Sequence, residues 1–202
     1  ADVVREFQSK CSNIKYYKNE KNIGFDRNLL SVIEKSTGSY CMTIGDDDAY
    51  FPESLTQIIQ KIKFFRAPYF MLNCWGYNRE LKNQMLSHAN LPYTEDQIFE
   101  KLTDFVRSVK SYRDLVGYFG SMSTQLFSRN AWVGFTGKDE YVGTQCVHMF
   151  IILSVFKDNK FVVLASPAVK TRGDNLRWDS YPGLETVFRR IRSTLKAIIW
   201  IK

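Results

Sequence analysis

The sequence predicts a single α/β domain, a class in which strands and helices alternate along the chain. Three observations favour it. Apolar residues recur with helical spacing in several segments, and short apolar runs typical of buried strands lie between these segments. A hydrophobic content of 45% and a charged content of 24% are ordinary for a globular protein. The 202 residues suit one core, and no apolar run approaches the roughly 18 residues of a membrane span.

The first half of the chain is expected to run strand, helix, strand, helix, strand. Apolar side chains spaced by three and four residues mark both helices, and proline favours the first turn of a helix. Gly38 stands where the glycine that ends a helix is usually found. The expected elements are a strand over 12–17, a helix between Gly24 and Gly38, a strand over 40–44, a helix from Pro52 and a strand over 69–72.

The second half is expected to be less regular. Thr94 is expected to cap a helix, because the apolar residues from Ile98 to Val109 recur on one helical face. The remaining expected elements are a strand over 125–127, a helix over 144–156, a strand over 161–164, a loop over 166–183 and a basic amphipathic helix over 184–202.

The charge balance favours an anionic partner. Lys and Arg number 28 against 21 Asp and Glu, which gives a net charge of +7. Nucleic acid, an acidic membrane surface and a phosphorylated small molecule all satisfy such a balance. Outside residues 184–202 the basic residues are scattered, which argues against nucleic acid. The four cysteines form no Cys-x-x-Cys pair, so no zinc site is expected, and reduced thiols of a cytoplasmic protein are the simplest interpretation.

Three adjacent carboxylates, Asp46, Asp47 and Asp48, follow the expected strand over 40–44 and are called the Asp cluster below. Their mutual repulsion costs stability unless a cation or hydrogen-bond donors compensate it. Ligands of open α/β sheets gather at the carboxyl ends of strands, and hard divalent ions prefer oxygen ligands. A metal site is therefore one interpretation. An acidic turn ahead of the helix at Pro52 is the other.

Motifs on both sides of the Asp cluster carry a family resemblance. They are Asn22-Ile23-Gly24-Phe25-Asp26-Arg27-Asn28, Thr37-Gly38-Ser39-Tyr40, Gly45-Asp46-Asp47-Asp48, Phe51-Pro52-Glu53-Ser54-Leu55 and Leu72-Asn73. Together they resemble glycosyltransferase family 2 over about residues 12–75. The chain is most similar to the bacterial surface-polysaccharide branch, the abequosyltransferase-like enzymes, which carry a Gly-Asp-Asp-Asp form of the metal motif.

The resemblance implies a GT-A fold, a mixed α/β sheet flanked by helices. Within one structural domain, residues 1–75 would be the remainder of the nucleotide-sugar half, 76–183 the acceptor half and 184–202 a basic amphipathic C-terminal helix. Family members begin with two strands that carry further nucleotide contacts, and these strands are absent here, where residues 1–11 resemble the helix that follows the second. The chain is therefore expected to be truncated at its N-terminal side and to lack much of the nucleotide site.

The resemblance also implies roles for single residues. Asp47 falls at the position of the metal-binding aspartate, with Asp48 as a further member, and the implied cofactor is Mn²⁺ or Mg²⁺. The residues that fall where family members hold the nucleotide-sugar are Asn22, Asp26, Arg27, Asn28 and Asp46. Arg27 is alternatively a solvated charge at the start of a helix.

The catalytic base of the family is an acidic residue at the start of the helix before the last core strand. Counting back from Phe161, that position falls near His148, where no carboxylate is found. Imidazole accepts a proton near neutral pH, so His148 is the candidate base. A packed core histidine is the other interpretation of His148, and Asp139 and Glu140 are the competing carboxylates.

The expected function is the transfer of a sugar from a nucleotide-diphosphate donor to a lipid-linked saccharide acceptor, in the synthesis of bacterial O-antigen, capsule or another polysaccharide. The resemblance implies a metal-dependent single displacement with inversion. No nucleic-acid partner is expected. Residues 184–202 have two interpretations: an ordinary helix whose apolar stripe packs on the core, which is favoured, and a helix that contacts the inner face of the plasma membrane from the cytoplasm. The alternatives are a non-catalytic fragment, a module that binds anionic membrane or nucleic-acid surfaces, and a nucleotidyltransferase.

Overall fold

The computed structural model describes residues 2–85, 90–173, 189, 193 and 194. The helix expected over 184–202, and the part of the expected loop beyond Gly173, lie outside the described residues.

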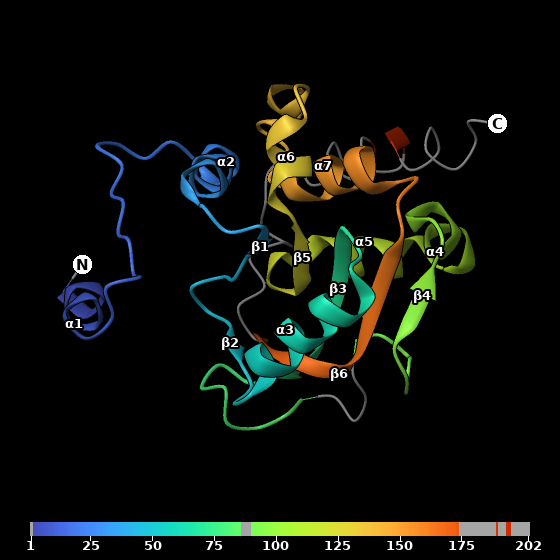
Figure 1. Ribbon diagram of the computed structural model, residues 1–202, viewed down its shortest axis with the longest axis horizontal. Helices are drawn as coiled ribbons and strands as arrows, with labels where there is room; N and C mark the ends of the chain where they lie inside the picture. The colour runs from blue at the N-terminus through green and yellow to red at the C-terminus, as the bar shows by residue number, and fades with distance from the viewer. Residues whose placement is uncertain (1, 86–89, 174–188, 190–192, 195–202) are drawn as a thin grey trace.

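A mixed sheet forms the centre of the molecule (Figure 1). Its strand order is β1–β5–β3–β6–β2, and β4 pairs with β6 beside this path. β3 and β6 run parallel, and the other pairs are antiparallel. The strands are β1 (Tyr40–Met42), β2 (Ala49–Tyr50), β3 (Tyr69–Tyr77), β4 (Gln97–Phe99), β5 (Gln125–Ser128) and β6 (Phe161–Arg172).

Helices cover both faces of this sheet. Side chains alternate along β3, so that Tyr69 and Met71 pack toward α2, α4, α5, α6 and α7, whereas Phe70 and Leu72 pack toward α3. The helices are α1 (Asp2–Lys10), α2 (Phe25–Lys35), α3 (Ser54–Phe65), α4 (Leu102–Ser108), α5 (Tyr112–Gly120), α6 (Arg129–Gly134) and α7 (Val147–Phe156), with 3₁₀ turns η1 (Met122–Thr124) and η2 (Lys138–Tyr141).

The helix expected over 144–156 is confirmed as α7, with a start at Val147. Eight of its ten residues are buried, and its sequence is apolar around the whole helix. Such a helix belongs in the interior of a fold. No helix among the described residues is both long and apolar enough to cross a membrane.

The prediction of a strand over residues 12–17 is wrong. These residues are exposed and belong to no described strand. In Figure 1, α1 and the segment that follows it stand apart from the sheet, and α1 has no buried residue. An isolated extended segment gains no ladder hydrogen bonds, because its backbone groups need a neighbouring strand as partner.

The helix expected after Thr94 is wrong in its first half. Residues 97–99 form β4, which pairs with β6, and α4 begins only at Leu102. Ile98 is 51% exposed, so it does not continue the apolar stripe, whereas Phe105 and Val106 are buried as expected. Pairing along the edge of the sheet therefore decides the conformation of residues 97–99.

The loop expected over 166–183 is wrong for residues 166–172, because β6 continues to Arg172. Its register against β3 shifts on both sides of Asn73, which lies opposite Pro167. A proline has no N–H to donate and is accommodated at such a bulge. Pro167 therefore interrupts the ladder without ending the strand.

Two helix ends also differ from expectation. α2 ends at Lys35 and is capped by Ser36 in extended conformation, so Gly38 is not the glycine that ends it. α3 begins at Ser54, two residues after Pro52, and follows Glu53 in the left-handed region with a φ of 64°.

Candidate active site

The Asp cluster lies on the turn between β1 and β2. The strand end before it is fixed by the segment after α5. The Thr43 hydroxyl donates a hydrogen bond to the Met122 carbonyl, and the Gly45 N–H donates to the Ser123 hydroxyl at 2.8 Å. Thr43 and Ser123 are both buried. The backbone that presents the carboxylates is therefore anchored to η1.

Asp48 is a carboxylate of the cluster whose two oxygens both accept hydrogen bonds from distant segments. One of its oxygens accepts from the Ser123 hydroxyl at 2.5 Å, and the other accepts from the backbone N–H of Arg172 at 2.9 Å. Burial raises the pKa of Asp48, the charge of Asp47 adds to the rise, and the two hydrogen bonds oppose it. Asp48 thus ties the turn to the end of β6.

Asp46 and Asp47 are the other two carboxylates of the Asp cluster. Asp46 is exposed and Asp47 is half-buried. The Oδ1 atom of Asp47 lies 2.7 Å from the position that a Cβ on Gly45 would occupy, so a side chain at Gly45 would displace it. The described residues contain no group of three or more His, Cys, Asp or Glu side chains that holds a metal ion by itself. Carboxylate oxygens of this number instead fit a hard divalent ion that takes its other ligands from phosphates and water.

Asp26 is buried, with 4% of its surface exposed, and it accepts hydrogen bonds from the protein's own backbone. Its donors are the N–H groups of Gly143 at 2.7 Å, Gln145 at 2.9 Å and Val147 at 3.3 Å. Gly143 and Gln145 have positive φ angles of 92° and 55°. In this conformation both N–H groups point to the same oxygen of Asp26. Asp26 therefore joins the first turn of α2 to the loop before α7.

The other predicted nucleotide contacts lie at the surface. Asn22, Arg27 and Asn28 are exposed. Asn22 accepts from the Gly24 N–H at 2.9 Å, and Asn28 accepts from the Asn19 amide at 2.8 Å. Asn22 and Asn28 line a pocket of about 370 Å³, and Arg27 is not among its lining residues.

His148 is a buried side chain, 2% exposed. Its Nε2 atom lies 3.1 Å from the Gly120 carbonyl, which only accepts, so Nε2 carries the proton and donates it. The Nδ1 atom is buried and has no hydrogen-bond partner among the residues that the structure describes. Burial lowers the pKa of His148, so its ring is neutral at pH 7. The competing carboxylates Asp139 and Glu140 are exposed on η2.

The structure brings His148 and the Asp cluster to one short segment. Gly120 contacts His148, and Ser123, three residues further on, contacts Asp48 and Gly45. Sequence reasoning missed Ser123 and Arg172, because they meet Asp48 from 75 and 124 residues away along the chain. Nothing in the local sequence signals either contact.

A mixed sheet with helices on both faces, and a carboxylate-rich turn at the end of a strand, define an α/β protein of the GT-A class. Solved structures of the S. aureus protein TarS (residues 1–349) confirm this fold. The form bound to UDP-GlcNAc superposes with a TM-score of 0.65 at 12% identity, over 98% of this chain and 57% of TarS. The form without ligand gives a TM-score of 0.64 at 13% identity, over 98% and 56%.

The sequence model described as "Glycosyl transferase family 2" matches residues 1–130, and the chain belongs to that family. Abequosyltransferase RfbV of Salmonella typhimurium is 28% identical over 164 residues, which are 79% of this chain and 49% of RfbV. The chain thus spans about half the length of RfbV and of the solved TarS chain, residues 1–349.

Proposed function

We propose that the chain carries the nucleotide-sugar cleaving site of a glycosyltransferase that builds a bacterial surface polysaccharide, O-antigen or capsule. The observation that carries this proposal is the family match over residues 1–130, which contains the Asp cluster and its flanking motifs. RfbV is named an abequosyltransferase, and TarS binds UDP-GlcNAc and UDP, which supports a nucleotide-diphosphate sugar as donor. The proposed acceptor is a saccharide on a lipid carrier.

Asp47, with Asp48 beside it, is the proposed holder of Mn²⁺ or Mg²⁺. When bound there, the ion would offset the negative charge that develops on the departing diphosphate. Asp48 keeps its orientation through Ser123 and Arg172. Burial of its carboxylate raises its pKa, so its charge is costly in the protein alone. A cation at the Asp cluster would relieve this cost.

Asn22, Arg27, Asn28 and Asp46 are the proposed nucleotide-sugar contacts. All four are exposed polar groups, and Asn22 and Asn28 line the pocket before α2. For Asp26 we propose a scaffold role instead. Its carboxylate is buried and already accepts three backbone hydrogen bonds, so it orders the loop that leads into α7.

The proposed reaction is a single displacement with inversion, in which a base removes the proton of the acceptor hydroxyl. His148 is the proposed base, because its Nδ1 lone pair accepts no hydrogen bond from the described part of the chain. Burial of the ring works against this role, and the exposed carboxylates Asp139 and Glu140 are the alternatives. We expect His148→Ala to lower kcat by about 100-fold while donor affinity stays the same. An unchanged kcat would return the role to Asp139 or Glu140, which Asp139→Asn and Glu140→Gln then separate.

The proposed function is tested by nucleotide release from a panel of UDP-, GDP-, CDP- and dTDP-sugars, with and without Mn²⁺, on the full-length protein. We expect Asp47→Ala to lose about 100-fold or more of the Mn²⁺-dependent rate. The matched control is Asp104→Ala, a half-exposed carboxylate on α4 whose partner Arg107 is equally exposed. Full activity of Asp47→Ala, or no release from any donor, would overturn the proposal.

A further inference from the structure

A second pocket, of about 970 Å³, opens beside α5 and the bulged part of β6. Four segments line it: Trp75 on β3, residues 90–94, residues 113–118 of α5 and residues 165–167 of β6. Its volume lies at the upper end of the range for small-molecule sites and exceeds the space that one sugar ring occupies. None of its lining residues belongs to the Asp cluster or to the pocket before α2.

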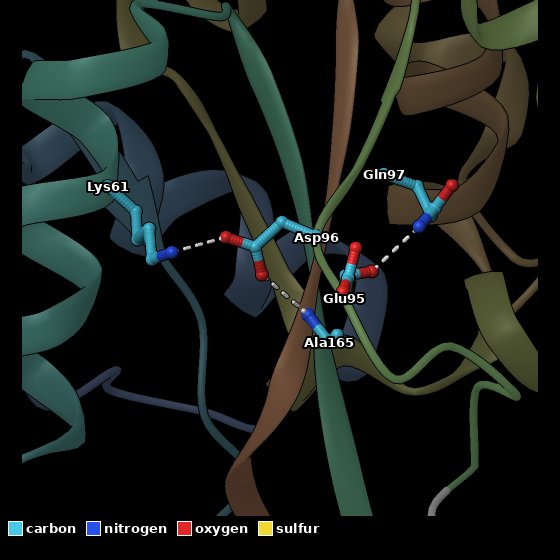
Figure 2. A network of polar contacts seen from close by, with 5 residues as sticks. All are labelled: Lys61, Glu95, Asp96, Gln97 and Ala165. Carbon is cyan, nitrogen blue, oxygen red and sulfur yellow. Dashed lines mark hydrogen bonds and ion pairs between the residues drawn. The ribbon is translucent and has the colours of Figure 1, made fainter.

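Two polar networks, one half-buried around Asp96 and one buried around Asn73, fix the walls of this pocket. The bulge in β6 frees the backbone of Ala165, whose N–H donates to Asp96 at 3.0 Å and whose carbonyl accepts from Asn73 at 2.9 Å. Figure 2 shows Asp96 between Ala165 and Lys61 of α3, with the Lys61–Asp96 ion pair at 2.5 Å. Asn73, fully buried, also bonds both the N–H and the carbonyl of Leu91, at 2.8 and 3.0 Å. Two of the lining segments are therefore held in place before any ligand binds.

The lining residues combine aromatic rings with neutral polar groups. Trp75, Tyr93 and Tyr118 are half-buried, so each ring offers part of its surface to the pocket. Burial raises the pKa of Tyr118, and Asp114 and Tyr93 add to the rise, so these groups lie close together. Rings of this kind stack against the C–H faces of a pyranose. The side chains that can bond sugar hydroxyls are Asn90, Thr94, Ser166, Arg113 and Asp114.

The net charge of the lining residues favours a neutral saccharide over a nucleotide as the ligand of this pocket. Among the described lining residues, Arg113 is the single cation and Asp114 the single anion, so their charges cancel. A diphosphate would require an excess of positive charge or a metal ion. A neutral saccharide requires neither, and the aromatic surface and polar groups match its two kinds of surface.

Two elements connect this pocket to the Asp cluster. α5 lines the pocket at Gly117 and Tyr118, and Ser123, shortly after its end, holds Asp48. β6 lines the pocket at Pro167, and its last residue, Arg172, donates to the second oxygen of Asp48. The pocket and the Asp cluster are therefore linked through the same two elements.

We propose that this pocket binds the neutral saccharide end of the acceptor, stacked against Trp75, Tyr93 and Tyr118. The proposal rests on the proposed function, since it assigns the second substrate of that reaction. Asn73 and Asp96 act as positioning residues for the pocket walls, because each bonds a lining segment without being a lining residue itself.

Gly117 allows a test that fills the pocket without disturbing the fold. A Cβ at Gly117 meets no heavy atom within 4 Å, and Gly117 lies within helix α5, where leucine is favoured over glycine. Gly117→Leu should therefore fold and occupy part of the pocket. Gly134→Leu is the matched control, because Gly134 is also helical, also has open space at its Cβ position, and is not a lining residue.

The assay is saturation-transfer NMR on the full chain with methyl glycosides of neutral hexoses, 6-deoxyhexoses and N-acetylhexosamines. We expect at least one glycoside to bind the wild type and Gly134→Leu, and to bind Gly117→Leu about tenfold more weakly or not at all. Binding should survive an excess of UDP. No signal from any glycoside, equal signals from both variants, or displacement by UDP would overturn the inference. Glycoside binding does not depend on donor cleavage, so failure of the proposed function appears separately, as absent nucleotide release.

Discussion

Replacing Asp26 with asparagine distinguishes a scaffold residue from a nucleotide contact. The substitution keeps the size of the side chain but turns one acceptor oxygen into an NH₂ donor. In its best orientation the amide oxygen keeps the N–H groups of Gly143 and Gln145, which share one oxygen in the native site. The NH₂ group then faces the N–H of Val147, whose native acceptor is the other oxygen. Two hydrogen bonds lose their charged acceptor, and one buried N–H loses its partner.

The expected cost follows from these three bonds. Exchanging a charged acceptor for a neutral one weakens each of the two retained bonds by about 1 kcal/mol, and an unsatisfied buried N–H costs about 1–3 kcal/mol. The free energy of unfolding should therefore fall by about 3–5 kcal/mol. For a chain of this size that loss lowers Tm by roughly 10 °C.

Urea unfolding followed by circular dichroism measures this loss directly. Asp104→Asn is the control, because Asp104 is half-exposed and its pair with Arg107 is 3.7 Å long, so its loss should stay within about 0.5 kcal/mol. If Asp26→Asn is as stable as the wild type and binds the donor more weakly, Asp26 is a nucleotide contact and the scaffold reasoning is refuted.

Three further predictions follow from the described contacts and the sequence. Because burial lowers the pKa of His148 below its usual 6.5, the unfolded chain binds a proton there that the folded chain does not, so stability falls as pH drops below about 6.5. His148→Gln should reduce the dependence of Tm on pH below about 6.5, as measured by thermal unfolding at several pH values. An unchanged dependence would mean that another group causes it. Ser123→Ala removes a hydrogen bond that favours the ionised form of Asp48, so the pKa of Asp48 should rise further in a carboxyl ¹³C NMR titration, and a fall would contradict the geometry. The full chain should float with anionic vesicles, whereas a chain that ends at Tyr181 should not, and equal flotation would exclude residues 184–202 as the membrane contact.

The sequence predicts correctly those helices and strands whose pattern of apolar residues lies within the element itself. β5, α2 and α7 each carry a sufficient apolar pattern within their own residues. β4 and the second half of β6 do not, because their conformation depends on pairing with strands far away in the sequence. The strand expected over 12–17 has the right composition, but no described strand pairs with it.

In the candidate site, too, the sequence reveals the local motif but not its partners from distant segments. The Asp cluster is visible in the sequence because three like charges in succession are costly without compensation. The groups that compensate Asp48 are not visible, since Ser123 and Arg172 come from distant segments. Asp26 is the intermediate case. The motif locates it, but only the fold shows that its carboxylate accepts three backbone N–H groups.

The segment from Gly117 to Ser123 contacts the proposed acceptor pocket, the proposed base and the Asp cluster. Gly117 and Tyr118 line the proposed acceptor pocket, Gly120 bonds the proposed base His148, and Ser123 bonds Asp48. Transfer of a sugar requires the acceptor hydroxyl, the base and the donor diphosphate to keep fixed relative positions, because small displacements of reacting groups are costly in rate. The segment from Gly117 to Ser123 contacts all three proposed positions, and β6, which also lines the pocket and binds Asp48 through Arg172, is a second element that the pocket and the Asp cluster share. A change in the length of the segment from Gly117 to Ser123 would therefore impair transfer to the acceptor more than it impairs cleavage of the donor by water.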